Sequence, residues 1–295
     1  MIECIECNVC DGRGKFEAAQ DFRDVACNVR AFQHEAFTVW RCPSCGSLHC
    51  KQAIDPDKYY RNYPVKSHKL DFWTRAAYAN YLHRLTNVKV DKNASVLDYG
   101  CGPGLLVEFL KQSGFCDVSG YDAHVPKFSD KAVLDRTYDL IIAQDVIEHV
   151  ENPREWLESL VQQLNSDGVL CIGTPNASGI NLSEADTFSL SLHQPYHRHL
   201  LSDRALIAIA EKAKLDVIAR HDRFYYDTLY PTVNYRFLRT YVRRAGNFLD
   251  AAFEKPHIAM VLISPKLWFF ALFGFFFPPR SEMMILFRKR SGCLT

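Results

Sequence analysis

The sequence has almost no excess of charge of either sign, and it lacks a secretory signal. Its 295 residues include 35 Lys and Arg against 34 Asp and Glu, which gives a formal net charge of +1. Nucleic-acid-binding proteins usually carry a basic footprint, so we expect no nucleic-acid partner. Residues 1–4 contain neither a basic segment nor an apolar core, and this predicts a cytoplasmic protein.

Long apolar runs, internal repeats and low-complexity segments are also missing. The aromatic-rich run at residues 267–277 has eleven residues. About twenty are needed to cross a bilayer, so we expect no transmembrane helix there. The length allows one large domain or two smaller ones with a full hydrophobic core.

Cysteine is abundant at one end of the chain, where seven of the eleven cysteines lie in the first fifty residues. In an intracellular protein such clustering favours metal binding over disulfides. Two C-x-x-C pairs, Cys7 with Cys10 and Cys42 with Cys45, are typical of a structural zinc ribbon, which we predict over residues 1–55. Three other side chains could replace a member of these pairs: Cys4, His49 and Cys50.

The rest of the chain has the pattern of an α/β protein. Residues 56–92 are predicted to form a helical connector, because apolar side chains recur there at helical spacing. From residue 93 to 295, strand and helix signals alternate, which predicts a doubly wound, Rossmann-like sheet. Only sixteen residues separate Asp122 from Asp139, so this part of the sheet is predicted to be abbreviated. A helical and aromatic insertion is expected at about 225–280, before a last strand at 283–287.

The most informative segment is Val-Leu-Asp-Tyr-Gly-Cys-Gly-Pro-Gly at residues 96–104. An apolar strand ends at Asp98, and three glycines follow at alternate positions: Gly100, Gly102 and Gly104. Glycine allows positive φ and a close approach of backbone to ligand, so a nucleotide-type ligand is expected over this turn. Asp122 ends the next strand about twenty residues later, where a carboxylate can accept both ribose hydroxyls.

This glycine spacing resembles motif I of class I S-adenosylmethionine (SAM)-dependent methyltransferases more than the G-x-G-x-x-G of dinucleotide-binding enzymes. The resemblance implies that Asp98 helps to hold the methionine amino group of SAM. It also implies that the last strand runs antiparallel at the edge of the sheet. An N-terminal ribbon occurs among such enzymes, including deoxysugar C-methyltransferases.

The segment Asp-Val-Ile-Glu-His-Val at residues 145–150 is similar to one in the ubiquinone-biosynthesis O-methyltransferases. In several relatives the matching acids and histidine bind a divalent cation. The resemblance therefore implies that Asp145, Glu148 and His149, with a downstream histidine, bind Mg²⁺ or Mn²⁺. Asp145 also belongs to the expected cofactor site. Alternatively, Glu148 and His149 only form hydrogen bonds with substrate or backbone.

Three histidines, His193, His197 and His199, precede a helix predicted from Ser202. Methyl transfer to an alcohol or a carbon acid needs a base with a pKa near neutrality, which suits histidine. We expect His197 or His199 to be catalytic, with His193, Glu148 and His149 as further candidates. The aromatic insertion could contact a membrane surface, admit a lipid-linked acceptor, form a homodimer interface or be buried in the core.

These observations favour a methyltransferase that transfers a methyl group from SAM to a small molecule, with oxygen as the preferred acceptor. Methylation of carbon or nitrogen on a sugar or lipid-linked acceptor stays open. A second reading is a regulatory or scaffold protein that binds SAM without catalysis. A third, a nicotinamide-dependent oxidoreductase, is disfavoured by the glycine spacing.

Overall fold

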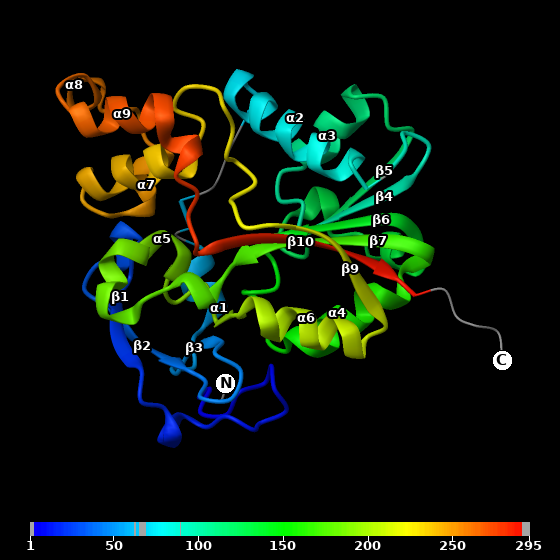
Figure 1. Ribbon diagram of the computed structural model, residues 1–295, viewed down its shortest axis with the longest axis horizontal. Helices are drawn as coiled ribbons and strands as arrows, with labels where there is room; N and C mark the ends of the chain where they lie inside the picture. The colour runs from blue at the N-terminus through cyan, green and yellow to red at the C-terminus, as the bar shows by residue number, and fades with distance from the viewer. Residues whose placement is uncertain (1–2, 62, 65–68, 89, 291–295) are drawn as a thin grey trace.

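The computed structural model describes residues 3–61, 63–64, 69–88 and 90–290 (Figure 1). Within these residues the strands form one sheet of four and one of six. The smaller sheet is antiparallel and has the order β1-β2-β3-β8. Its strands are β1 (Phe22–Ala26), β2 (Ala36–Arg41), β3 (Leu48–Cys50) and β8 (His199–Leu200). The N-terminal cysteine-rich segment is therefore joined by a strand that comes from much later in the chain.

The larger sheet has the strand order β5-β4-β6-β7-β10-β9 and is the predicted doubly wound α/β sheet. The first four strands are parallel, and β10 runs antiparallel to both of its neighbours. Its strands are β4 (Ser95–Tyr99), β5 (Asp117–Tyr121), β6 (Tyr138–Gln144), β7 (Leu164–Pro175), β9 (Leu215–His221) and β10 (Glu282–Lys289).

One expectation about this sheet is wrong: β10 is antiparallel but lies between β7 and β9, so the edge strand is β9. The first six residues of β10 are buried, which fits an apolar strand covered on both faces. In β9, by contrast, only Leu215 is buried.

The predicted abbreviation next to β5 is confirmed. Between β5 and β6 the chain forms only two 3₁₀ helices, η3 (Pro126–Phe128) and η4 (Lys131–Asp135). No further strand stands outside β5 in the described residues.

Helices cover both faces of the larger sheet (Figure 1). On one face lie α2 (Phe72–Thr86) and α3 (Leu105–Gln112), whose side chains pack against Val96 and Leu140. On the other lie α4 (Pro153–Gln162) and α6 (Asp203–Lys212), which pack against the alternate strand positions. The predicted start of α6 is confirmed, because Ser202 caps it, and Asn152 caps α4 in the same way.

The residues between β9 and β10 form a helical lobe, which lies beyond one end of the sheet (Figure 1). Its elements are α7 (Tyr235–Arg244), η7 (Leu249–Ala252), α8 (Ile258–Leu262), α9 (Pro265–Phe273) and η8 (Gly274–Phe276). The remaining short helices are η1 (Phe16–Ala18), η2 (Arg30–Phe32), α1 (Pro56–Tyr60), η5 (Ala177–Gly179), η6 (Leu182–Phe188) and α5 (Ser189–Leu192). None of the helices in the described part of the chain is both long and apolar enough to cross a membrane.

Candidate functional site

The glycine turn after β4 has the backbone geometry that its sequence predicts. Gly100, Gly102 and Gly104 all have positive φ, at 80°, 51° and 81°. A Cβ on Gly100 would lie 2.4 Å from Val146 Cγ2, whereas one on Gly102 would meet nothing within 4 Å. The Gly102 N–H donates to Asp122 Oδ2 at 2.9 Å. The turn thus holds its backbone next to open space and beside a carboxylate.

A cavity of about 490 Å³ lies beside this turn, at the carboxyl ends of β4, β5 and β6. In parallel α/β sheets ligands bind at this edge, and the volume is within the usual range for small-molecule sites. Four of the predicted site residues line the cavity: Gly100, Asp122, Asp145 and His149. The cavity is therefore where a cofactor bound over the glycine turn would lie.

Two carboxyl groups near this cavity, the buried Asp98 and the half-buried Asp145, have raised pKa values. Burial raises the pKa of Asp98 to about 7, and the nearby charge of Asp122 adds to the effect. Burial likewise raises the pKa of Asp145 to about 7. A cationic ligand would offset these shifts, because an opposite charge favours the ionised carboxylate. SAM carries a sulfonium and an ammonium group, so the acidic lining fits it.

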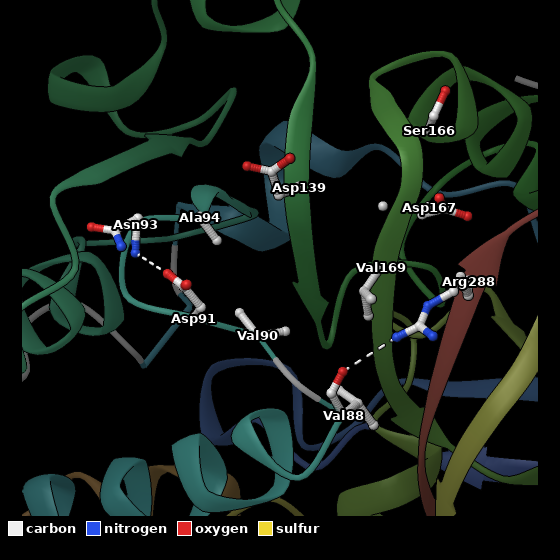
Figure 2. A pocket seen from close by; sticks show the side chains of 11 residues that line it. Val88, Val90, Asp91, Asn93, Ala94, Asp139, Ser166, Asp167, Val169 and Arg288 are labelled. Atoms are coloured by element: carbon white, nitrogen blue, oxygen red, sulfur yellow. Dashed lines mark hydrogen bonds between the residues drawn. The ribbon is translucent and has the colours of Figure 1, made fainter. Parts of the chain in front are cut away.

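A second cavity, of about 430 Å³, lies at the opposite edge of the sheet (Figure 2). It is lined by residues at the amino ends of β4 and β6, and by Arg288, which donates to the Val88 carbonyl at 3.3 Å. It contains none of the predicted site residues. Since ligands of open α/β sheets bind at the carboxyl edge, we assign no function to this cavity.

A cluster of potential ligands stands next to the first cavity. One ligand atom from each of Glu148, His149 and His197 lies within 4.8 Å of the others. Glu148 is fully buried; its Oε2 accepts from Thr174 Oγ1 at 3.0 Å, and its Oε1 has no hydrogen-bond partner. His197 Nε2 lies 4.0 Å from Glu148 Oε1, too far for a hydrogen bond. A divalent cation would satisfy this orphaned oxygen.

The histidines of this cluster are oriented by backbone carbonyl groups. His149 Nδ1 lies 3.0 Å from the Tyr196 carbonyl oxygen, and His197 Nδ1 lies 2.7 Å from that of Ser191. Because a carbonyl can only accept, both Nδ1 atoms carry hydrogen and both Nε2 atoms offer lone pairs. Burial lowers the pKa of His149 to about 4 and that of His197 well below the usual value, so both rings are neutral at neutral pH.

The other predicted residues of this group lie in different places. His193 packs beside His197 with ring centroids 5.0 Å apart, and its buried Nε2 has no partner. Asp145 lines the cavity but is not one of the three clustered ligands. His199 points away from Glu148, toward the N-terminal sheet, where its Nδ1 lies 3.0 Å from His49 Nδ1. The structure therefore brings His193 and His197, but not His199, toward Glu148.

Aromatic residues that we did not predict also line the site. Tyr60 stacks on His124 at 5.4 Å, and its hydroxyl lies 3.1 Å from His149 Nδ1. Tyr63 and Tyr196 line the same cavity. The group Tyr59, Tyr60 and Tyr63 is visible in the sequence, but its periodicity gives no sign that it folds back over the strand ends.

The four predicted zinc ligands come together at the N-terminus. The Sγ atoms of Cys7, Cys10, Cys42 and Cys45 all lie within 4.8 Å of one another. Two of the separations are 3.6 and 3.7 Å, close to the edge of a tetrahedron with Zn–S bonds of about 2.3 Å. A Cβ on Gly14 would lie 2.1 Å from Cys42 Sγ, so glycine is needed there. The donor set fits a structural zinc ion, and Cys4 and His49 lie in a separate group with His199.

Comparisons with known proteins agree with this geometry. A family model described as a methyltransferase domain matches residues 71–220. The ubiquinone biosynthesis O-methyltransferase of Rickettsia typhi is 25% identical over 139 residues, which cover 36% of this chain and 56% of that protein. The chain thus spans about half the length of the curated relatives it matches.

Solved structures of methyltransferases are similar to the chain at lower identity. The plantazolicin methyltransferase in complex with SAH is 20% identical, with 80% of this chain and 91% of that chain covered and a TM-score of 0.41. The magnesium protoporphyrin IX methyltransferase of Synechocystis PCC 6803 is 17% identical, with 56% and 86% covered and a TM-score of 0.38.

Proposed function

Because this chain belongs to the methyltransferase-domain family, we propose that it transfers a methyl group from SAM to an oxygen atom of a small molecule. We further propose that Glu148, His149 and His197 bind a divalent cation that contacts this acceptor. The observation that carries the proposal is the buried Glu148 Oε1, which has no partner and faces a lone-pair nitrogen. Imidazole donors favour Mn²⁺ over Mg²⁺ at such a site.

We propose that SAM binds over the glycine turn. Asp122 would accept from the ribose hydroxyls, and the buried Asp98 would face the ammonium group. Gly102 supports this placement, because the space beside its backbone is open. Asp145, which lines the cavity next to the clustered ligands, would complete the cofactor site.

Methyl transfer to oxygen breaks the S–CH₃ bond, whose electron pair stays on sulfur, and forms a C–O bond as the acceptor loses its proton. Such an in-line displacement depends mainly on alignment. A divalent cation held by these residues would lower the pKa of a nearby acceptor hydroxyl, so a weakly basic group would suffice to accept its proton. We propose His193 for this role, since its Nδ1 lies 2.6 Å from Asn28 Oδ1 and its Nε2 is free.

At the N-terminus, we propose that Cys7, Cys10, Cys42 and Cys45 bind a structural zinc ion. Four thiolates would close its coordination shell, so this ion would take no part in methyl transfer. The division into a ribbon at 1–55, a connector at 56–92 and a methyltransferase domain at 93–295 belongs to the same proposal.

The test combines Mn²⁺ binding with methyl transfer in the full-length protein. Glu148→Gln and His197→Gln should each abolish Mn²⁺ binding. Electron paramagnetic resonance measures this binding. They should also lower methylation of phenol or catechol acceptors on the order of 100-fold. His83→Gln, at an exposed histidine of α2, is the matched control and should retain Mn²⁺ binding. Unchanged Mn²⁺ affinity in both site variants would refute the cation, and methyl groups found on nitrogen or carbon would refute the oxygen acceptor.

A further inference from the structure

The outer face of the helical lobe is apolar and exposed. Nine large apolar side chains on or next to α8, α9 and η8 are each 45–76% exposed. This aromatic face consists of Ile258, Leu262, Ile263, Trp268, Phe269, Leu272, Phe273, Phe276 and Phe277. Soluble monomers rarely expose contiguous apolar patches of more than a few hundred Å², and such patches usually mark a binding surface.

Helical geometry makes this a continuous surface. In α9, Leu267 and Ala271 are buried toward the lobe, while Trp268, Leu272 and Phe273 lie on the other side. The rings of Phe269 and Phe273 are 5.4 Å apart, so the exposed side chains contact one another. Trp268 Nε1 donates to the Leu262 carbonyl at 3.1 Å and joins α9 to α8.

The same part of the chain concentrates positive charge. The lobe, residues 222–281, contains eight Arg and Lys but only four acids, although the whole chain is almost neutral. Two of these acids face Arg30 outside the lobe: Asp250 accepts from its backbone N–H, and Glu254 forms an ion pair with its guanidinium group. Five basic side chains of the lobe are exposed: Arg243, Arg244, Lys255, Lys266 and Arg280.

The exposed apolar side chains and the positive charge together distinguish between two possible partners of the aromatic face. A two-fold interface between copies of the chain would place the cationic lobe against itself, which is unfavourable. An anionic bilayer has the opposite charge. Its interfacial region also accommodates Trp and Phe side chains beside Lys and Arg. We propose that the aromatic face docks the protein on the surface of an anionic lipid bilayer, without crossing it.

The lobe is also connected to the candidate site. The Tyr235 hydroxyl in α7 lies 3.0 Å from Ser191 Oγ, and the Ser191 carbonyl accepts from His197 Nδ1 at 2.7 Å. A bilayer bound by α8 and α9 would therefore lie against the lobe. The lobe in turn contacts the loop that carries the candidate catalytic histidines.

The experiment is flotation of the full-length protein with vesicles of phosphatidylcholine alone or with 30% phosphatidylglycerol. We expect binding to the anionic vesicles and at least tenfold weaker binding to the neutral ones. The double variant Leu272→Ser/Phe276→Ser should lower binding by roughly tenfold or more, because it removes two apolar side chains from the interface. Phe22→Ser, which changes a Phe that is 57% exposed on β1, is the control and should bind as the unchanged protein does.

Three results would overturn the proposal. One is no binding to anionic vesicles, and another is full binding by the double variant. The third is a stable dimer in light scattering that the double variant converts to monomers. SAM titration of each variant reports whether it is folded. Vesicle binding does not depend on the acceptor atom, so failure of the proposed O-methylation would leave this result unaffected.

Discussion

At the scale of single residues, Asp122 both shapes the glycine turn and faces the cavity. Its Oδ2 accepts from Gly102 N–H at 2.9 Å, and its Oδ1 accepts from His124 N–H at 2.8 Å. Each carboxylate oxygen has a further acceptor position, so these bonds leave room for ligand hydroxyls. The same side chain can therefore fix the turn and bind the ribose of SAM.

Asp122→Ala should weaken SAM binding by about 10- to 100-fold, the usual cost of losing hydrogen bonds to a charged group. Isothermal titration calorimetry gives the affinity directly. Asp135→Ala is a suitable control, because Asp135 is an exposed acid in the segment between β5 and β6. Unchanged affinity in Asp122→Ala would show that this carboxylate does not contact the cofactor.

The histidine loop, residues 193–199, shows how far the orientation of single side chains can be predicted from the sequence. The sequence places His193, His197 and His199 near the site, because they lie between the carboxyl end of β7 and the predicted helix from Ser202. Which way each side chain points depends on partners far away in the chain. His199 meets His49, 150 residues earlier, and the ring of His193 meets Asn28. No local pattern contains that information.

At the scale of secondary-structure elements, β8 joins the cysteine-rich sheet to the histidine loop. Leu48 pairs with Leu200 and His49 with His199, so β3 and β8 are adjacent strands. His197 lies two residues before β8. We therefore expect the position of the candidate cation ligands to depend on whether the cysteine cluster is well ordered.

Replacing Cys42 and Cys45 by serine should remove about one zinc ion per chain, measured by elemental analysis. It should also weaken Mn²⁺ binding at Glu148 and His197, because β3, the strand that pairs with β8, would then be less well ordered. SAM affinity should change less, since the glycine turn lies on β4. Cys116→Ser, at an exposed cysteine, is the control. An unchanged zinc content in the double variant would contradict the ribbon assignment.

The strand order of the larger sheet was only partly predictable. Alternating helix and strand signals indicate the parallel strands and the antiparallel last strand, because each element has its own periodicity. The position of β10 depends on which strand it pairs with, and pairing is a long-range property. Its uninterrupted apolar run, Met-Met-Ile-Leu-Phe, fits burial on both faces and was a signal for an interior position.

At the scale of the whole molecule, buried titratable groups link stability to pH. Burial raises the pKa of Asp98 and Asp145 to about 7 and that of Glu282 to about 8. Burial lowers the pKa of His149 to about 4 and that of His193 to about 3. The two sets overlap at lower pH, but Glu282 still titrates near pH 8, where the histidines are neutral in both states, so its contribution can be measured there.

The carboxyl groups bind protons in the folded protein that the unfolded chain has already released above a pH of about 4. Their contribution to stability is therefore lost as the pH rises toward 7 or 8. The histidines act in the opposite direction, because the unfolded chain binds their protons below a pH of about 6.5. The unfolded histidines are half protonated at that value and nearly all neutral about one pH unit above it, so from about pH 7.5 the carboxyl groups determine the trend.

The free energy of unfolding, measured by urea denaturation without SAM or added metal, should therefore fall between about pH 7.5 and 8.5, where Glu282 in particular still titrates. The slope should be up to about 1.4 kcal/mol per pH unit for each carboxyl group that is still protonated. Glu282→Gln should make the slope shallower, because glutamine keeps an acceptor for Ser191 Oγ, now 2.7 Å from Oε1, but does not titrate. Stability that is constant or rising over this range would mean that these carboxyl groups are ionised in the folded protein.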